Sequence, residues 1–295
     1  MKERTLYALG FFDGVHLGHQ ALLQTCREMA GETGCKAGVI TFDTHPDTLV
    51  LGKTPDLISS LADRRRLLTA YGMEKIVTLD FDRAMMEMPW QDFFRMIVEV
   101  YGAAGIVCGE DFHFGHRGEG TAQKLKEACE KEGVFCWVVP EQILEGVRVS
   151  STHIRILLER GDMAAAVRFL GHPYVLTGTV VAGQQLGRTM GIPTANLTLS
   201  PEVLLPKLGV YAGKAQVQDK EYTAMVNIGS RPTVNGVGVT AEVHLLDFAG
   251  DLYGKELTVW LHHFLRPEKK FPDLGALQRE IEENRQQILD FFEKK

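Results

Sequence analysis

The sequence predicts two domains in series: an α/β domain with a parallel sheet, then a β-barrel that ends in a helix. Up to about residue 170, short β-rich runs alternate with longer helical patterns, and from Tyr174 strand-like runs are separated by Gly, Pro and Asn turns. The 295 residues are enough for two cores. Because Pro173 disfavours helix at the residue before it, the boundary is placed near Gly171, which gives domains at 1–170 and 171–295.

The first domain is predicted from alternating strands and helices, which imply a parallel sheet covered on both faces. In such open α/β folds ligands bind at the carboxyl edge of the sheet. One helix is expected to begin near Gln20. The predicted strands are Leu6–Leu9, Ala37–Thr41, Ile76–Leu79, Ile106–Cys108 and Phe135–Val139, and the other predicted helices are Asp63–Ala70, Trp90–Tyr101 and Ala122–Lys131.

The second domain is predicted from many short strands with turn residues between them, a pattern typical of a closed or nearly closed barrel. A last helix is expected after Asp273, with Leu274, Leu277, Ile281 and Ile288 spaced to share one face. The strand-like runs are Tyr174–Val181, Val210–Val217, Tyr222–Ile228, Thr240–Leu246 and Glu256–Phe264.

Composition and charge narrow the class of protein. A formal net charge of −6 argues against a protein that binds nucleic acid mainly by neutralising phosphates. No apolar run approaches the about 20 residues of a membrane span, and the N-terminus lacks the apolar core of a signal peptide. Five cysteines without C-x-x-C spacing favour reduced thiols over disulfides or a zinc site. The expectation is a cytoplasmic protein without nucleic-acid or membrane partners, and a homo-oligomer is left open.

The most informative segment is His16-Leu-Gly-His19, which follows the first strand and leads into a helix. A helix N-terminus favours anions, and Gly18 lets the backbone approach a phosphate closely. An isolated H-x-x-H is more often a pair of turn histidines, but the strand–turn–helix context favours function. The segment resembles the ATP site of nucleotidyltransferases that transfer AMP and release pyrophosphate.

Three further segments are expected at the same edge of the sheet: 41–46, 109–118 and 149–155. The second is rich in Gly and polar residues, and its alternative interpretation is a solvated loop. In the third, capping alone explains one hydroxyl of Ser150, Ser151 and Thr152. It does not explain Arg155 in the first turn, where a cation opposes the helix dipole. An anion held by the hydroxyls, the helix N–H groups and the guanidinium explains all four residues.

In the second domain, residues 183–196 contain three glycines and then Pro-Thr-Ala-Asn, which indicates a loop that curls around phosphates. Thr194 and Asn196 are uncharged oxygen donors suited to a Mg²⁺ that also carries nucleotide phosphates. The alternative is a long barrel hairpin. Residues 227–233 are expected to form a second ordered turn. Glu242 lies on a predicted strand, where a carboxylate is usually only solvated.

Taken together, these segments resemble the bacterial bifunctional riboflavin kinase/FMN adenylyltransferase family, also called FAD synthetase. The resemblance covers essentially the whole chain and rests on an ordered set of motifs. They are Phe12-Asp-Gly-Val-His-Leu-Gly-His19, Ser150-Ser-Thr152 with Ile154-Arg155, Gly187-Arg188, Pro193-Thr-Ala-Asn196 and Asn227-Ile-Gly229.

The resemblance implies a Rossmann-like nucleotidyltransferase domain followed by a six-stranded antiparallel β-barrel domain with a C-terminal helix. It implies ATP-dependent phosphorylation of riboflavin to FMN, then transfer of AMP from ATP to FMN, with Mg²⁺ accompanying ATP. In the first domain it assigns catalysis to His16, His19 and Arg155, ATP binding to Gly10, Phe12, Asp13, Gly18, Ser150, Ser151 and Thr152, and flavin binding to Asp111 and Phe112.

In the second domain the resemblance makes Glu242 the general base. It implies ATP binding by Gly187, Arg188, Thr194 and Asn196, with Thr194 and Asn196 also serving the metal, and flavin binding by Asn227 and Arg231. The chain departs from the family pattern at Phe11 (usually Asn), at Asp43-Thr44 (commonly Glu-Pro), and at His113 and His172 (each usually Arg). These departures leave the predicted fold unchanged. The His113 change is expected to weaken flavin or phosphate binding in the first domain and so to lower adenylyltransferase efficiency.

Overall fold

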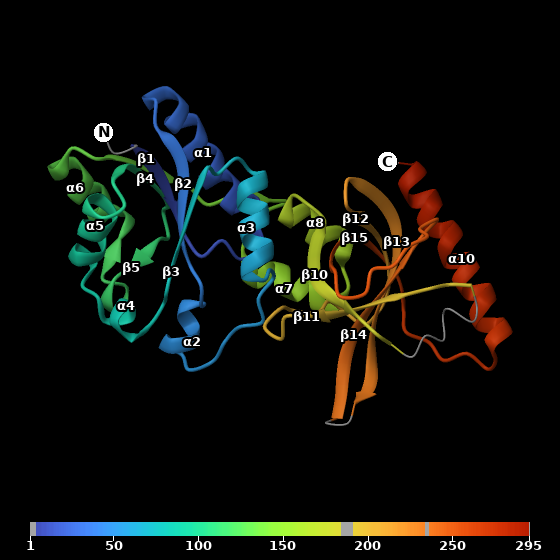
Figure 1. Cartoon of the computed structure of the whole chain (residues 1–295). Coiled ribbons are helices and arrows are strands. Elements are labelled where there is room, and N and C mark those ends of the chain that lie inside the picture. The colour runs from blue at the N-terminus through green and yellow to red at the C-terminus, as the bar shows by residue number, and fades with distance from the viewer. Residues whose placement is uncertain (1–3, 184–190, 234–235, 295) are drawn as a thin grey trace. The chain divides into compact units, whose positions relative to one another are not determined.

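The computed structural model of the chain describes residues 4–183, 191–233 and 236–294, and the side chains of residues 230–239 are outside that description. The backbone forms two compact units (Figure 1). One comprises Met1–Leu57 and Leu61–Ser151, and the other comprises Ile58–Ser60 and Thr152–Lys295. The segment from Thr152 to Leu170 therefore groups with the second unit.

The first unit contains a five-stranded parallel sheet in the order β3-β2-β1-β4-β7. This confirms the predicted α/β architecture, and β1 and β4 are neighbours at the point where the strand order reverses. The strands are β1 (Thr5–Leu9), β2 (Lys36–Phe42), β3 (Lys75–Leu79), β4 (Ala103–Gly109) and β7 (Phe135–Val139).

Helices cover both faces of this sheet, with α1 on one side and α5 and α6 on the other (Figure 1). Alternate residues of β1 belong to different cores: Leu6 and Ala8 pack with Leu23 of α1, whereas Tyr7 and Leu9 pack with Ile97 of α5. The helices are α1 (Leu17–Thr33), α2 (Pro46–Val50), α3 (Leu61–Ala70), α4 (Arg83–Glu87), α5 (Trp90–Glu99) and α6 (Ala122–Glu132).

Short elements complete the carboxyl side of the first unit. The 3₁₀ turn η1 (Asp13–Val15) precedes α1, and two small hairpins follow β4 and β7. These hairpins are β5 (His113–Phe114) with β6 (Gly120–Thr121), around the 3₁₀ turn η2 (His116–Gly118), and β8 (Ile143–Leu144) with β9 (Val147–Arg148).

Helix α1 begins at Leu17, three residues before the predicted start near Gln20. The reason is an uncommon cap: His16 is the N-cap residue, and its Nδ1 accepts a hydrogen bond from the backbone N–H of His19 at 3.3 Å. Serine, threonine, aspartate and asparagine are the usual residues in this role. As a result Gly18 and His19 lie in the first helical turn.

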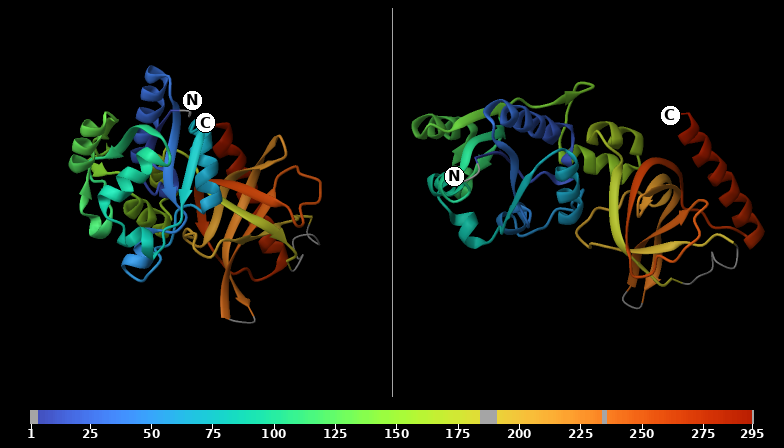
Figure 2. Two further views of the ribbon diagram at one scale, coloured as in Figure 1. Left: turned by 60° about the vertical axis from the view of Figure 1, so that its left-hand side comes forward. Right: turned by 45° about the horizontal axis from the view of Figure 1, so that its top comes forward.

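The second unit is a closed six-stranded barrel in the order β10-β11-β14-β13-β12-β15, preceded by two helices (Figures 1 and 2). The predicted barrel and its closing helix are confirmed. Its elements are α7 (Ser151–Arg160), α8 (Met163–Leu170), β10 (Tyr174–Val181), β11 (Ala195–Leu199), β12 (Gly209–Val217), β13 (Lys220–Thr233), β14 (Gly236–Leu245), β15 (Glu256–Pro267) and α10 (Leu274–Glu293).

The ordered turn predicted at residues 227–233 is wrong, because these residues belong to β13 and pair with β14. Strand β11 is the sixth barrel strand, and the residue pattern did not predict it. It lies at the end of the segment interpreted as a phosphate loop, so Thr194 directly precedes a strand and Asn196 is part of it. The strand is defined by its partners, because Ala195–Leu199 pairs with both β10 and β14. Pairing across the barrel prevails here over local turn signals.

Helix α10 runs alongside the barrel and covers part of its outer surface (Figure 2). It begins directly after Asp273, as predicted, and Asp273 caps it by accepting a hydrogen bond from the N–H of Ala276 at 2.7 Å. Ile281 and Ile288 pack against the barrel. Leu274 does not share that contact, since it is 66% exposed at the first helical position.

All five cysteines are free thiols, as expected. Burial raises the pKa of Cys26 to about 11 and that of Cys108 to about 12, so both stay protonated near neutral pH. Within the described ranges, no helix combines the length and the apolar character needed to cross a membrane.

Candidate functional site

A cavity of about 260 Å³ lies at the carboxyl edge of the parallel sheet, within the first unit. It opens where β1 and β4 lie side by side, which is where open α/β folds bind ligands. Eight of the residues predicted for this site line it: Gly10, His16, Gly18, His19, Asp111, Phe112, Ser150 and Ser151.

The two histidines of the first motif form one stacked pair in this cavity. Their ring centroids are 3.6 Å apart with an interplanar angle of 13°. Gly18 makes room for the arrangement, because a Cβ atom there would lie 3.1 Å from Cε1 of His16. The motif thus places both imidazoles at the first turn of α1.

His19 is a half-buried, neutral imidazole. Burial lowers its pKa well below the ordinary value of 6.5, and the neighbouring charges of His16 and Arg64 lower it further. Its Nδ1 is buried and has no hydrogen-bond partner among the residues that the structure describes. A buried polar atom of this kind calls for an explanation, and a ligand in the cavity supplies one.

The loop between β1 and α1 has strained backbone. Phe12 and Val15 have positive φ angles of 61° and 41°, which are costly for residues with bulky or branched side chains. Gln20 Nε2 donates to the carbonyl of Val15 at 2.9 Å, and Ser151 Oγ donates to that of Asp13 at 3.1 Å. These bonds hold the loop in a conformation that the isolated segment would not keep.

Arg64 of α3 holds the same loop from the other side. Its side chain is fully buried and donates to the carbonyls of Phe11 at 3.0 Å and Phe42 at 2.7 Å. Its guanidinium carbon lies 3.9 Å from the centre of the Phe11 ring, and Thr41 Oγ1 also donates to the Phe11 carbonyl. The buried guanidinium of Arg64 therefore connects, by hydrogen bonds, the chain segments that follow β1 and β2.

A charged cluster forms another wall of the cavity. Arg148 pairs with Asp111, and it also lies 2.8 Å from an oxygen of Glu141. Phe112, next to Asp111, stacks on Phe114 with ring centroids 5.3 Å apart. The predicted flavin residues Asp111 and Phe112 are thus held by an ion pair and by an aromatic stack.

In the second unit, Glu242 of β14 lies in register between two asparagines. Asn196 of β11 opposes it on one side and Asn227 of β13 on the other. Directly opposed residues in antiparallel strands point to the same face, with Cα atoms about 4.5–5.5 Å apart. Val210, which opposes Asn227, belongs to the cluster that packs on α10. This Glu242 row (Asn196, Glu242, Asn227) therefore shares the outer face of the barrel with α10.

A second cavity, of about 380 Å³, begins at one end of this row. Thr194 and Asn196 line it together with Tyr253. Gly183 lies against the Asn196 side chain, since a Cβ atom there would be 2.3 Å from its Nδ2. The cavity thus joins two uncharged oxygen donors to a row that carries a carboxylate.

Comparison with known proteins gives a family match for each half of the chain. The FAD synthetase family model matches residues 1–153 and the riboflavin kinase family model matches residues 170–292. The bifunctional riboflavin kinase/FMN adenylyltransferase of Escherichia coli K12 is 35% identical over 294 residues, covering 99% of this chain and 94% of that protein. The chain belongs to the bifunctional riboflavin kinase/FMN adenylyltransferase family.

Other relatives of the same name agree. The Pseudomonas fluorescens protein is 38% identical over 92% of this chain and 88% of its own length, and the Listeria monocytogenes protein is 34% identical over 97% and 92%. A crystal structure described as a macrolide-efflux protein from Streptococcus pneumoniae has a TM-score of 0.87 and 31% identity, covering 97% of this chain and 94% of that one. The two-unit fold is therefore shared along nearly the whole chain.

The other predicted site residues have varied positions. Phe12 and Asp13 are buried beside the first cavity, with the Phe12 ring 5.2 Å from that of His19. Thr152 and Arg155 lie on α7 and group with the second unit. Gly187 and Arg188 fall outside the described residues, as does the side chain of Arg231.

The positions that depart from the family pattern make local contacts. Phe11 uses its backbone carbonyl to accept from Arg64, and this bond does not depend on the side chain. Asp43 Oδ1 accepts from the N–H of Phe81 at 2.9 Å. His113 is exposed, with Nδ1 3.2 Å from the carbonyl of Gly118, and His172 Nδ1 lies 2.8 Å from that of Pro173.

Two residues of the first site were missed from the sequence. Arg148 directly precedes the Val149–Arg155 segment, and only this position in the chain pointed to a place in the site. Arg64 stands in the run Asp63-Arg-Arg-Arg66, which is typical of a solvated helix face, although its own side chain is fully buried.

Replacing Arg64 by methionine is expected to raise the pKa of His19 and to destabilise the fold. The substitution removes a nearby positive charge and two hydrogen bonds from a charged donor, worth on the order of 3 kcal/mol together. NMR titration of His19 and thermal unfolding measure the two effects. Arg65→Met, on the exposed face of the same helix, is the matched control and should change neither. A His19 pKa that does not move in folded Arg64→Met would contradict this role.

Proposed function

We propose that this chain carries out two consecutive transfers from ATP, phosphorylating riboflavin to FMN at the barrel and transferring AMP to FMN at the parallel-sheet cavity. Membership of the family supports both reactions. We assign adenylyl transfer to residues 1–170 and phosphorylation to residues 171–295. The separate ranges of the two family models support this division.

In the kinase reaction, the terminal hydroxyl of the ribityl chain attacks the γ-phosphorus of ATP. An oxygen–phosphorus bond forms, the bond to ADP breaks, and the hydroxyl proton passes to the Glu242 carboxylate. Asn196 and Asn227 on either side of Glu242 are suited to orient the hydroxyl and the phosphate, because their amides both donate and accept. Positioning dominates such phosphoryl transfers.

Mg²⁺ fits the donor set in the barrel. Magnesium bound with nucleotide phosphates takes only one or two oxygen ligands from the protein, and the Thr194 hydroxyl and the Asn196 amide oxygen are of that kind. The described residues contain no cluster of three or more His, Cys, Asp or Glu that could cage a metal alone. When bound, the ion neutralises phosphate charge, and Thr194 and Asn196 hold it with ATP.

In the adenylyltransferase reaction, a phosphate oxygen of FMN attacks the α-phosphorus of ATP and pyrophosphate leaves. FMN is already ionised, so the site needs hydrogen-bond donors more than a base. The neutral His19 ring, stacked on His16 at the start of α1, supplies one N–H donor for the phosphates. Ser150, Ser151, Thr152 and Arg155 are proposed to bind the departing pyrophosphate.

The remaining predicted residues keep their proposed roles. Gly10, Phe12, Asp13 and Gly18 shape the first ATP site, and Gly187 and Arg188 serve ATP in the barrel. Flavin binding is assigned to Asp111 and Phe112 in the first unit and to Asn227 and Arg231 in the second. We propose that neither reaction involves nucleic acid, consistent with the net charge of −6, and that the protein is cytoplasmic.

The observation that carries the proposal is a chemical difference between the two sites. The Glu242 row contains a carboxylate, which can accept the proton of a hydroxyl nucleophile. In the first cavity, the buried Nδ1 of His19 has no hydrogen-bond partner among the described residues, which suits an anion that needs no deprotonation. Each site thus matches one of the two reactions.

The test is incubation of the pure chain with riboflavin, ATP and Mg²⁺, with the flavins separated by chromatography. FMN should accumulate first and FAD should follow. FMN without FAD would contradict adenylyl transfer, and unchanged riboflavin would contradict the kinase assignment.

A further inference from the structure

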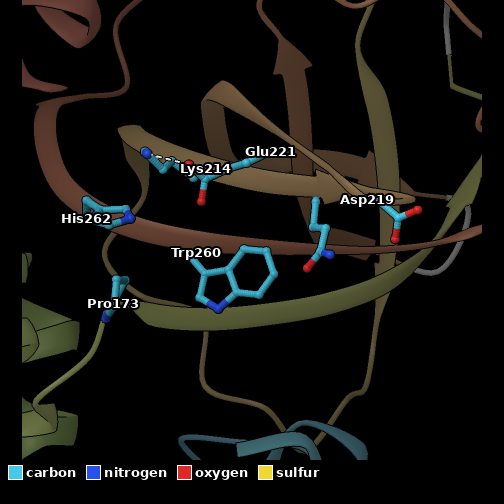
Figure 3. Close-up of a pocket in the computed structure, with 7 residues that line it drawn as sticks. Pro173, Lys214, Asp219, Glu221, Trp260 and His262 are labelled. Atoms are coloured by element: carbon cyan, nitrogen blue, oxygen red, sulfur yellow. Dashed lines mark hydrogen bonds and ion pairs between the residues drawn. The ribbon is translucent and has the colours of Figure 1, made fainter. Parts of the chain in front are cut away.

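A third cavity, of about 460 Å³, lies on the barrel surface away from the Glu242 row. Its volume is within the range of pockets that hold small organic molecules. Trp260 of β15 forms its floor, and its rim includes Lys214, Gln216, Asp219, Glu221 and His262 (Figure 3).

This cavity is distinct from the proposed kinase site. Lys214 and Gln216 lie four and six residues beyond Val210 along β12, and Val210 is the residue that opposes Asn227 of the Glu242 row. At about 3.3 Å per residue, the separation is about 13–20 Å. Alternate residues of a strand share a face, so both sites lie on the outside of the barrel.

The floor is a flat aromatic surface held in place by the sheet. Trp260 is half-buried and opposes Lys214 of β12 on one side and Val175 of β10 on the other. Figure 3 shows its indole ring in the middle of the labelled side chains. On one side of it, His262 packs edge-to-face on Phe292 of α10, with ring centroids 5.1 Å apart. An indole face of this kind stacks well with another planar ring.

The rim carries both signs of charge. Lys214 pairs with Glu221, and Asp219 adds a second carboxylate at the turn between β12 and β13. The two carboxylates would repel an anionic phosphate, and Lys214 would repel a cation. Gln216, whose Nε2 donates to the carbonyl of Gln218 at 3.1 Å, supplies an amide that can both donate and accept. The rim therefore favours an uncharged ring that carries donors and acceptors.

We propose that this cavity binds an uncharged, flat heteroaromatic ring stacked on Trp260, and that its occupant is riboflavin rather than FMN, FAD or ATP. The choice of riboflavin rests on the proposed function, because it is the uncharged member of that set. The barrel then has a second riboflavin site besides the one where phosphorylation occurs.

The test uses the full chain labelled with 5-fluorotryptophan, which has three reporters: Trp90, Trp137 and Trp260. FMN and MgADP are added first to fill the product sites, and riboflavin is then titrated. Riboflavin should shift the Trp260 fluorine signal saturably, and FMN should need at least a tenfold higher concentration for the same shift. Adenosine, also flat and uncharged, tests whether riboflavin is the preferred ring.

Variants identify the site. When FMN and MgADP fill the product sites, Trp260→Leu should abolish the remaining binding of riboflavin, measured by equilibrium dialysis. Trp260→Phe should retain that binding within about fivefold. Glu221→Gln should strengthen FMN binding several-fold, because it frees the Lys214 charge. An unmoved Trp260 signal, equal binding of FMN, or tighter binding of adenosine would overturn the proposal. These readouts require no turnover, so a failure here is distinguishable from a failure of the kinase assignment.

Discussion

Replacing Glu242 by glutamine should slow conversion of riboflavin to FMN by about 100-fold or more. The substitution preserves the size and most of the hydrogen-bonding geometry of the side chain but removes its ability to accept a proton. General-base assistance is typically worth about 10²–10⁴ in rate. Riboflavin binding should change much less than kcat, because the lost interaction matters mainly in the transition state. Single-turnover kinetics and equilibrium dialysis measure the two quantities separately.

Two controls accompany this variant. FMN supplied directly should still become FAD at the normal rate, since that reaction is assigned to the other unit. Glu202→Gln, at an exposed position of the second unit, should leave both rates unchanged. Kinase activity of Glu242→Gln within about fivefold of the native rate would contradict the general-base role and show that Glu242 is an ordinary solvated carboxylate on a strand.

Replacing His19 by alanine should reduce FAD formation by about 10²–10³-fold and leave FMN formation intact. The variant removes a donor from the proposed phosphate site, and loss of one preorganised donor to developing charge has about this effect. His19→Gln, which keeps an N–H donor, should recover part of the loss. The rates of both reactions in each variant provide the measurement.

The outcome is interpreted together with stability. Equal loss of both activities at an unchanged melting temperature would contradict the assignment, and equal loss with a lowered melting temperature would make His19 structural. The pKa of His19 is lowered in the folded chain, so the unfolded chain binds more protons below its ordinary pKa of 6.5. The contribution of His19 to the free energy of unfolding is therefore fully present above pH 6.5 and declines as the pH falls below it. His19→Gln should remove that decline.

The fold was largely predictable because its periodicities are strong. Alternation of strands and helices indicated the parallel sheet, and the change of rhythm after Pro173 indicated the barrel. Strand β11 was missed because Pro193 and Asn196 are local turn signals, whereas the strand depends on pairing with β10 and β14. The start of α1 was missed because a histidine cap is uncommon.

The candidate sites were predictable as residue types but not as arrangements. The sequence placed Glu242 on a strand, but its register with Asn196 and Asn227 follows only from how the barrel closes. Arg64 is surrounded by charged residues along the chain, so its burial under Phe11 follows from tertiary packing alone. That the Nδ1 of His19 has no hydrogen-bond partner within the described part of the chain is likewise a property of the folded cavity.

The proposed function assigns the two reactions to separate sites, so FMN released by one chain should serve as substrate for another. Its most direct test is to mix Glu242→Gln and His19→Ala, supply riboflavin, ATP and Mg²⁺, and measure FAD. Glu242→Gln alone should leave riboflavin largely unchanged, and His19→Ala alone should stop at FMN. The mixture should form FAD at a rate set by the concentration of FMN released. A mixture that accumulates FMN without FAD, although Glu242→Gln converts added FMN, would contradict the account.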